Sequence, residues 1–212
     1  MEDCMLFLLI SFVFAEAPKG WNLVGTTNGV EVARKKVAGK NVFAFRGEAT
    51  TDVSVETFAA VLADESLSPK WVDMMVESKI VKTYPDDAAL LHQKYDIPWP
   101  MDDRDYVFKK DILFDSAAKK VVVTLKSVED PLVPPAAGYV RAEGERTFWS
   151  FEVLPNGKTK IIVEVMTDPK GAMPDWLVNS VQEDWPHKSI NSLINYAKTQ
   201  SPAPHPRCAG WQ

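Results

Sequence analysis

Residues 95–114 read YDIPWPMDDRDYVFKKDILF, and their second half has the plainest strand pattern in the chain. Side chains along a β-strand point alternately to opposite faces. One face carries Arg104, Tyr106, Phe108, Lys110, Ile112 and Phe114, and the other carries Asp105, Val107, Lys109, Asp111 and Leu113. If the first face is concave, a tyrosine hydroxyl and an ammonium group lie among aromatic rings; otherwise Lys110 extends to an edge and nothing binds. Tyr106, Phe108 and Lys110 are therefore candidate ligand-binding residues.

Other segments share this two-residue period and read as strands. They are Ile80–Tyr84, Ala89–Ile97, Val121–Ser127, Tyr139–Val153 and Thr159–Thr167, beside Asp105–Phe114 itself. Residues 21–51 divide into further short β-rich pieces, with Asn28-Gly29 as a hairpin turn.

Two segments have the helical period instead. Ser54 is a candidate N-cap for a short helix with apolar residues at helical spacing. A second, longer helix is predicted over Pro174–Thr199, and Pro186 is expected to kink it. Three strands, a helix, about six antiparallel strands and a long final helix predict an α+β fold, because a parallel α/β fold alternates strands with helices.

A curved sheet and one long helix can enclose a cavity. A sheet of about nine strands curls strongly because of its twist, and an amphipathic helix can cover its concave face. We expect a hydrophobic tunnel between them, with Trp99, Trp149, Met173, Trp176 and Val181 contributing to its wall.

The predicted gate of the tunnel consists of this helix and an apolar loop. Residues 131–138 read PLVPPAAG, and such a loop either touches a membrane or packs on the terminal helix. We expect the Asp130–Gly138 loop and the helix to open together at a membrane surface, with Leu132, Val133 and Pro186 as gate residues. The alternative for Pro186 is that it simply starts a second helical segment.

Several motifs follow one another along the chain: Trp21 with Gly29-Val30, Asp64 before Lys70-Trp71, Tyr95–Val107 with its PWP and RD sequences, Gly138–Arg141, and Asp168–Gly171 leading to Met173–Asn179. In this order they resemble the START (steroidogenic acute regulatory protein-related lipid transfer) domain family. The resemblance spans residues 21–199 and is strongest to phosphatidylcholine-transfer members. It implies a helix-grip (START/Bet v 1-like) fold, one lipid or sterol-like molecule in the tunnel, and neither catalysis nor a cofactor.

The headgroup residues of phosphatidylcholine-transfer members match poorly. The position of their phosphate-binding arginine is Ser68 here. Of three aromatic residues that surround choline in those members, only Tyr106 matches, and the other two positions are Gln93 and Glu145. A choline site needs aromatic faces around the cation, so this resemblance argues against phosphatidylcholine.

Sterol-binding members use a buried acid and a buried arginine. The arginine position is Lys110 here, and the acid position falls near Leu91, so the pair is not kept. A lone buried lysine loses its charge or recruits an acceptor. We therefore expect a phosphate, carboxylate or hydroxyl of the ligand near Lys110.

The expected function is non-enzymatic lipid transfer, with two alternatives. One is a sensor or holder that binds a lipid without moving it. The other is a cyclase or hydrolase of a related helix-grip fold, which needs an acid–base residue in the cavity. His92 is the only histidine in a predicted strand, and we expect it to pair at the sheet edge instead.

Composition limits the partners. The formal net charge is −5, whereas nucleic-acid binding requires a basic field. His92, His187 and His205 are scattered and lack metal-ligand spacing. We expect a monomer that meets a lipid and, transiently, a membrane surface.

The N-terminus has the pattern of an export signal. Residues 4–15 read CMLFLLISFVFA, and Ala15-Glu16-Ala17 fits a cleavage site. We expect residues 1–17 to be a signal peptide, 18–200 the lipid-binding domain and 201–212 a loose proline-rich tail. Cleavage would make the protein secreted or periplasmic; otherwise it is membrane-associated or cytoplasmic.

Overall fold

A computed structural model describes residues 18–40, 42–99, 101–171, 174–200 and 202–211. The predicted signal peptide lies outside these residues. The strands are β1 (Asn22–Thr27), β2 (Val30–Lys36), β3 (Phe43–Thr51), β4 (Met75–Tyr84), β5 (Ala88–Tyr95), β6 (Asp103–Asp115), β7 (Lys120–Ser127), β8 (Tyr139–Arg141), β9 (Glu143–Val153) and β10 (Thr159–Asp168). The helices are α1 (Val55–Ala63), α2 (Asp175–Gln200) and the 3₁₀ helices η1 (Glu65–Lys70) and η2 (Pro206–Cys208).

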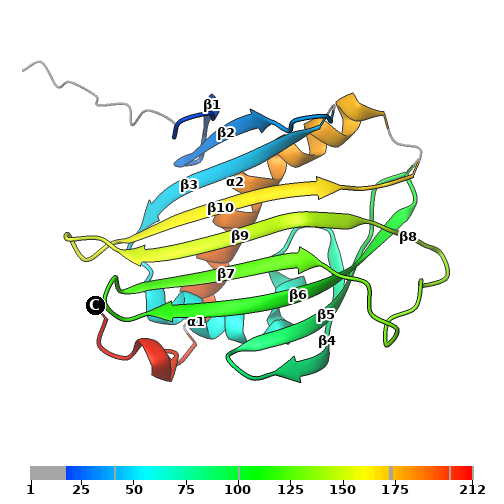
Figure 1. Ribbon diagram of the computed structural model, residues 1–212. Coiled ribbons are helices and arrows are strands. Elements are labelled where there is room, and N and C mark those ends of the chain that lie inside the picture. Colours follow the sequence, from blue (N-terminus) through cyan, green and yellow to red (C-terminus); the bar gives the residue numbers. More distant parts are fainter. Residues whose placement is uncertain (1–17, 41, 100, 172–173, 201, 212) are drawn as a thin grey trace, which may run out of the picture.

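The strands form one curved sheet in the order β1-β2-β3-β10-β9-β7-β6-β5-β4, and α2 crosses its concave face (Figure 1). All pairs are antiparallel except β8, which pairs with β6 in parallel. The predicted strand Tyr139–Val153 is therefore two strands. They part at Ala142, whose N–H donates to the Asp105 carbonyl while β9 turns to pair with β7 and β10. The α+β helix-grip fold predicted from the sequence is confirmed.

The short helix α1 packs one apolar face into the core. Ser54 caps it as predicted, accepting a hydrogen bond from the Thr57 N–H. Phe58 is fully buried, and its ring stacks on Phe151 of β9 with 4.9 Å between centroids. This contact joins α1 to the sheet.

The long helix α2 continues through Pro186, which lies in a tight helix–sheet contact. A Cβ atom built on Gly47 of β3 would lie 2.9 Å from both Pro186 Cβ and Ile190 Cδ1. Only a glycine lets the helix approach so closely without a shift. The middle of α2 is therefore held against the sheet at Pro186.

The C-terminal tail is packed, which corrects the expectation of a loose segment. Cys208 and Trp211 are buried in the main core. The N–H groups of Gly210 and Trp211 donate to Glu56 Oε1 at 2.7 and 3.1 Å, respectively. Proline content alone favours a loose tail, but burial of an indole and two hydrogen bonds to one carboxylate outweigh it.

Among the described residues, no helix has the length and hydropathy needed to cross a membrane.

Candidate functional site

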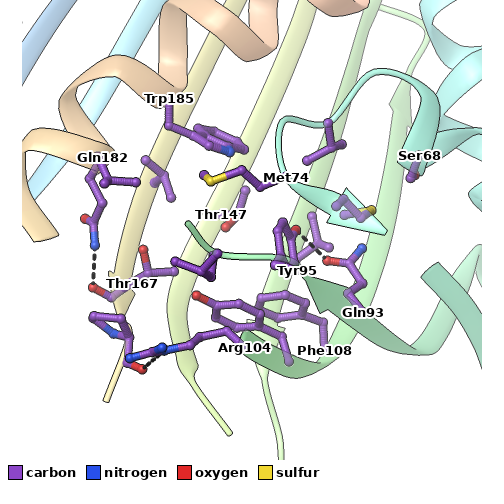
Figure 2. Close-up of a pocket in the computed structure, with 18 of the residues that line it drawn as sticks. Ser68, Met74, Gln93, Tyr95, Arg104, Phe108, Thr147, Thr167, Gln182 and Trp185 are labelled. Atoms are coloured by element: carbon purple, nitrogen blue, oxygen red, sulfur yellow. Dashed lines mark hydrogen bonds between the residues drawn. The ribbon is translucent and has the colours of Figure 1, made fainter. Parts of the chain in front are cut away.

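A cavity lies between the concave face of the sheet and α2 (Figure 2). It offers about 150 Å³ to water-sized molecules, and the empty space between its walls totals about 1180 Å³ when the part open to solvent is counted. Elsewhere, an enclosed cavity of roughly 150 Å³ holds one benzene molecule. A whole lipid therefore requires the walls to move apart.

The inward face of β6 forms one side of the cavity, as its alternation predicts. Arg104, Tyr106, Phe108 and Lys110 all line it. Tyr106 stacks on Phe108 with 5.2 Å between centroids and meets Tyr95 edge-on at 5.3 Å. Burial raises the pKa of both tyrosine hydroxyls, so both stay neutral and polar at the cavity wall.

Lys110 has a carboxylate partner, which corrects the prediction of a lone cation. Its Nζ lies 2.6 Å from Glu65 Oε2 and donates to the Leu62 carbonyl at 2.6 Å. Burial alone raises the pKa of Glu65, but the Lys110 ammonium and hydrogen bonds from Ser78 and Ser68 outweigh it and hold the pKa below 4.5. The pair is thus ionised although both side chains are buried.

The sequence pattern missed Glu65 because the contact joins residues 45 positions apart. Glu65 opens η1, and Asp64 caps that helix. The sequence does place an acidic residue shortly after an apolar helix. The periodicity of neighbouring residues, however, does not show that this residue contacts a strand. Gln93 of β5 donates to Glu65 Oε1 at 3.1 Å. Lys110, Glu65 and Gln93 together form a polar corner of the cavity.

Arg104 joins two segments at the other end of the cavity. Its guanidinium donates to the carbonyls of Pro169 and Lys170 at 3.0 and 3.1 Å, and also to the Asp102 carbonyl. The first two carbonyls belong to the connection between β10 and α2, and the third to the loop between β5 and β6. Arg104 is 3 % exposed, so these carbonyls replace water around its charge.

Tryptophans and helix side chains form the rest of the wall. Trp149 of β9 meets Trp71 edge-on at 5.7 Å and Trp185 of α2 at 6.0 Å between centroids. Val181 and Gln182 of α2 also line the cavity (Figure 2 shows Gln182 and Trp185 on the helix side). The structure therefore brings together Tyr106, Phe108, Lys110, Trp149 and Val181 of the residues expected in the wall.

Two expected wall residues lie outside the cavity. Trp99 is 91 % exposed and Trp176 is 71 % exposed. Trp99 follows the end of β5, in a turn closed by the Met101 N–H and the Pro98 carbonyl. Trp176 lies in the first turn of α2, before the helix reaches the sheet. Met173 lies outside the described residues.

The predicted gate loop lies on the opposite face of the sheet from the cavity. Val133 packs with Leu90 and Val107, and Val107 is on the outward face of β6. Arg141 fixes the loop by donating to the Val133 and Pro134 carbonyls at 3.3 and 3.1 Å. An apolar loop needs an apolar partner, and Val107 supplies one away from α2. The gate role expected for Leu132 and Val133 is therefore not compatible with their position.

His92 also lies on that outward face. Its Nε2 is 2.8 Å from Asp105 Oδ2, and Arg141 binds the same carboxylate at 2.8 and 3.0 Å. Burial raises the pKa of Asp105, but Arg141 and His92 outweigh it and hold the pKa below its ordinary value. The carboxylate is thus enclosed by the Arg141 guanidinium and the His92 imidazole, with the sheet between it and the cavity.

Comparisons with known proteins agree with this architecture. The sequence model of the START domain matches residues 14–194. An uncharacterized protein of Pseudomonas aeruginosa is 29% identical over 178 residues, which cover 84% of this chain and 87% of that protein. Human START domain-containing protein 10 is 26% identical over 181 residues, 84% of this chain, and the chain spans only 61% of that protein.

Two solved structures have the same fold. The crystal structure of human STARD10 superposes with a TM-score of 0.79 at 25% identity, covering 88% of this chain and 76% of that one. Human StAR-related lipid transfer protein 5 gives 0.81 at 21% identity, covering 88% and 90%.

Proposed function

Since this chain belongs to the START domain family, we propose that it binds one lipid-like molecule beneath α2 and carries it between membranes. The observation that carries the proposal is the cavity, whose wall is mainly aromatic and aliphatic with a few buried polar groups. Each methylene removed from water contributes about 0.8 kcal/mol, so such a wall can extract an acyl or sterol body from solvent.

The polar corner suggests which part of the ligand it meets. Lys110 is already neutralised by Glu65, so a phosphate or carboxylate there would place a second anion beside the Glu65 carboxylate. A hydroxyl can instead accept from Lys110 or donate to Glu65, and a carbonyl can accept from Lys110, in each case without adding charge. We therefore favour a neutral ligand end at this corner over an anionic one.

Opening of the cavity has a structural basis in α2. Pro186 and Ile190 contact β3 at Gly47, which holds the middle of the helix. The first half bears Val178, Val181 and Gln182 over the cavity. We propose that residues 175–185 move to admit the ligand while the second half stays in place. Hydrogen exchange tests this: amides of 176–185 exchange faster than those of 187–198, and equal protection along α2 would contradict it.

Two measurements test binding and transfer. Native mass spectrometry of the purified protein after incubation with mixed-lipid vesicles should show one bound lipid per chain. A fluorescent lipid should then move from donor to acceptor liposomes at a rate proportional to protein concentration. Bound lipid without protein-dependent transfer identifies a holder or sensor, and the absence of any bound lipid overturns the proposal.

The enzymatic alternative is weaker because His92 is on the outward face, bound to Asp105. The side chains that face the cavity include Glu65 and Lys110, which neutralise one another. We propose that the bound molecule leaves unchanged. Recovery of a chemically altered lipid after incubation with wild type, but not with the Glu65→Gln variant, would contradict this.

Export of the protein remains a proposal supported by the apolar run of residues 4–15 and Ala15-Glu16-Ala17. N-terminal sequencing of the protein from its native source tests it. A mature chain that begins at Pro18 supports a secreted or periplasmic location, and a chain that begins at Met1 contradicts it.

A further inference from the structure

The C-terminal tail, residues 202–211, lies beyond the part of the chain that the START domain model matches, which ends at residue 194. Figure 1 shows the tail, in red, at the same end of the molecule as α1. Cys208 is fully buried, and Trp211 is 8 % exposed in the same core as Ala197 of α2. Ordering such a segment costs conformational entropy, so its contacts with the rest of the chain must offset that cost.

The tail is joined to α1 through one residue. The Glu56 carbonyl accepts a hydrogen bond from the His205 N–H at 3.2 Å, and Glu56 Oε1 accepts from the N–H groups of Gly210 and Trp211. Glu56 is 6 % exposed and lies in the first turn of α1. Hydrogen bonds from N–H groups to a carboxylate are stronger than those between neutral groups. Glu56 therefore holds the tail at two separate points along its length.

The tail also contacts the sheet. The His205 ring stacks on Phe114 of β6 with 5.0 Å between centroids. The Arg207 guanidinium lies 4.4 Å from the centre of the same Phe114 ring, and it forms an ion pair with Asp87 in the turn between β4 and β5. The tail thus ties the start of α1 to β6 and to the β4–β5 turn.

The other end of α1 supplies part of the polar corner. The Leu62 carbonyl accepts from Lys110 Nζ at 2.6 Å, and the Leu62 side chain lines the cavity. Glu65, the carboxylate partner of Lys110, opens η1 shortly after α1 ends. Backbone hydrogen bonds join each turn of a helix to the next, and α1 has only nine residues. A shift of α1 at Glu56 would therefore displace both acceptors of Lys110.

We propose that the C-terminal tail is a strap that holds α1 against the sheet and thereby keeps the polar corner assembled around a bound molecule. The proposal rests on the proposed function and adds to it an element that controls how long the molecule is retained. With the strap attached, the Leu62 carbonyl and Glu65 stay within hydrogen-bond reach of Lys110. With the strap loosened, α1 can shift, the corner opens and the bound molecule leaves sooner.

Three variants separate retention from stability alone. Glu56→Ala removes the carboxylate that binds the tail, and Arg207→Ala removes the contacts of the tail with Phe114 and Asp87. Val133→Ala is the control, because it removes buried apolar contacts on the outward face of the sheet, away from both the tail and the cavity. Urea unfolding measures the stability that each variant loses.

Release of lipid is the readout. Each protein is loaded from vesicles of deuterated phosphatidylcholine, diacylglycerol and cholesterol and then mixed with excess unlabelled vesicles of the same composition. Native mass spectrometry follows the loss of deuterated lipid from the protein. We expect this loss to be about tenfold faster than in wild type for Glu56→Ala and about threefold faster for Arg207→Ala, and unchanged for Val133→Ala.

Two results overturn the strap. One is release at the wild-type rate from either folded tail variant, and the other is release that rises with lost stability alike in all three variants. If Glu56→Ala does not fold, Arg207→Ala decides, because its side chain is 52 % exposed and its removal leaves the core intact. Wild type that holds no lipid overturns the proposed function instead, so the two failures are distinguishable.

Discussion

The two faces of β6 each bury a charged group, but they enclose it differently. On the outward face, Asp105 is surrounded by Arg141 and His92, and Arg141 also binds two carbonyls of the 130–138 loop. On the inward face, Lys110 meets Glu65 beside an open cavity. The outward charge of Asp105 is satisfied by two side chains of the chain itself, Arg141 and His92. The inward pair of Lys110 and Glu65 has space beside it for a bound molecule, so the outward charge is structural and the inward pair is a candidate for ligand binding.

Removal of Asp105 should cause the largest loss of stability. The Asp105→Ala variant leaves Arg141 and His92 without their shared carboxylate and releases the loop, so we expect a loss of about 4 kcal/mol. Urea unfolding gives the free energy, and native mass spectrometry of the folded fraction should show the wild-type lipid. A changed lipid with unchanged stability would reverse the roles of the two faces.

Removal of Lys110 should cost about 3 kcal/mol at neutral pH, because Glu65 keeps three hydrogen-bond donors but loses its counter-charge. The pH dependence is the sharper signal. In wild type the pKa of Glu65 is below the value of 4.5 that it has in the unfolded chain. The ionised carboxylate therefore stabilises the folded protein above pH 4.5, and this stabilisation is lost as the pH falls.

In the Lys110→Met variant, burial still raises the pKa of Glu65 and the lowering by the ammonium is gone, so the pKa is higher than in wild type and the carboxylate contributes less stability at neutral pH. The stability difference between wild type and variant should therefore shrink from pH 7 toward pH 4. Urea unfolding at several pH values measures it, and a difference independent of pH would show that Glu65 is not the partner of Lys110.

Gly47 and Gly144 both lie against inward-facing side chains, so substituting each of them compares a packed part of the inward side with an open part. A Cβ at Gly47 would lie 2.9 Å from Pro186 Cβ and from Ile190 Cδ1, and the proline ring cannot rotate away, so Gly47→Ala should cost about 2 kcal/mol. A Cβ at Gly144 meets the Phe108 ring, which borders the cavity and can turn into it. Gly144→Ala should therefore cost less stability but lower lipid occupancy, and equal effects in thermal unfolding would contradict this.

A smaller stability loss than for Lys110→Met alone is expected for the Lys110→Met/Glu65→Leu double variant. Replacing both members of a buried ion pair with apolar side chains of similar size is often nearly neutral, but Ser68, Ser78 and Gln93 lose their acceptor here, so we expect a net loss of about 1.5 kcal/mol. The bound lipid should nevertheless shift toward species without a hydroxyl or carbonyl at that end. An unchanged lipid profile by mass spectrometry would remove the polar corner from ligand selection.

Local pattern predicted the faces of β6 because strand alternation depends only on neighbouring residues. It did not predict the partner of Lys110, since Glu65 reaches it through the packing of η1 on β4 and β5. Nor did it show that Trp149, which lies in a strand, faces the cavity, whereas Trp99, which lies beyond the end of β5, is exposed. The apolar loop at 130–138 was recognised, but which face it covers depends on the pairing of Arg141 with Asp105, 36 residues away.

The central claim is that the space beneath α2 receives a lipid, and filling that space tests it most directly. Thr147 lines the cavity, and a Thr147→Trp variant places an indole in it, whereas Thr124→Trp is a matched change at a position outside the described cavity lining. Native mass spectrometry should show one lipid bound to wild type and to the folded Thr124→Trp protein, and none to folded Thr147→Trp. Undiminished lipid on the Thr147→Trp protein would contradict the account.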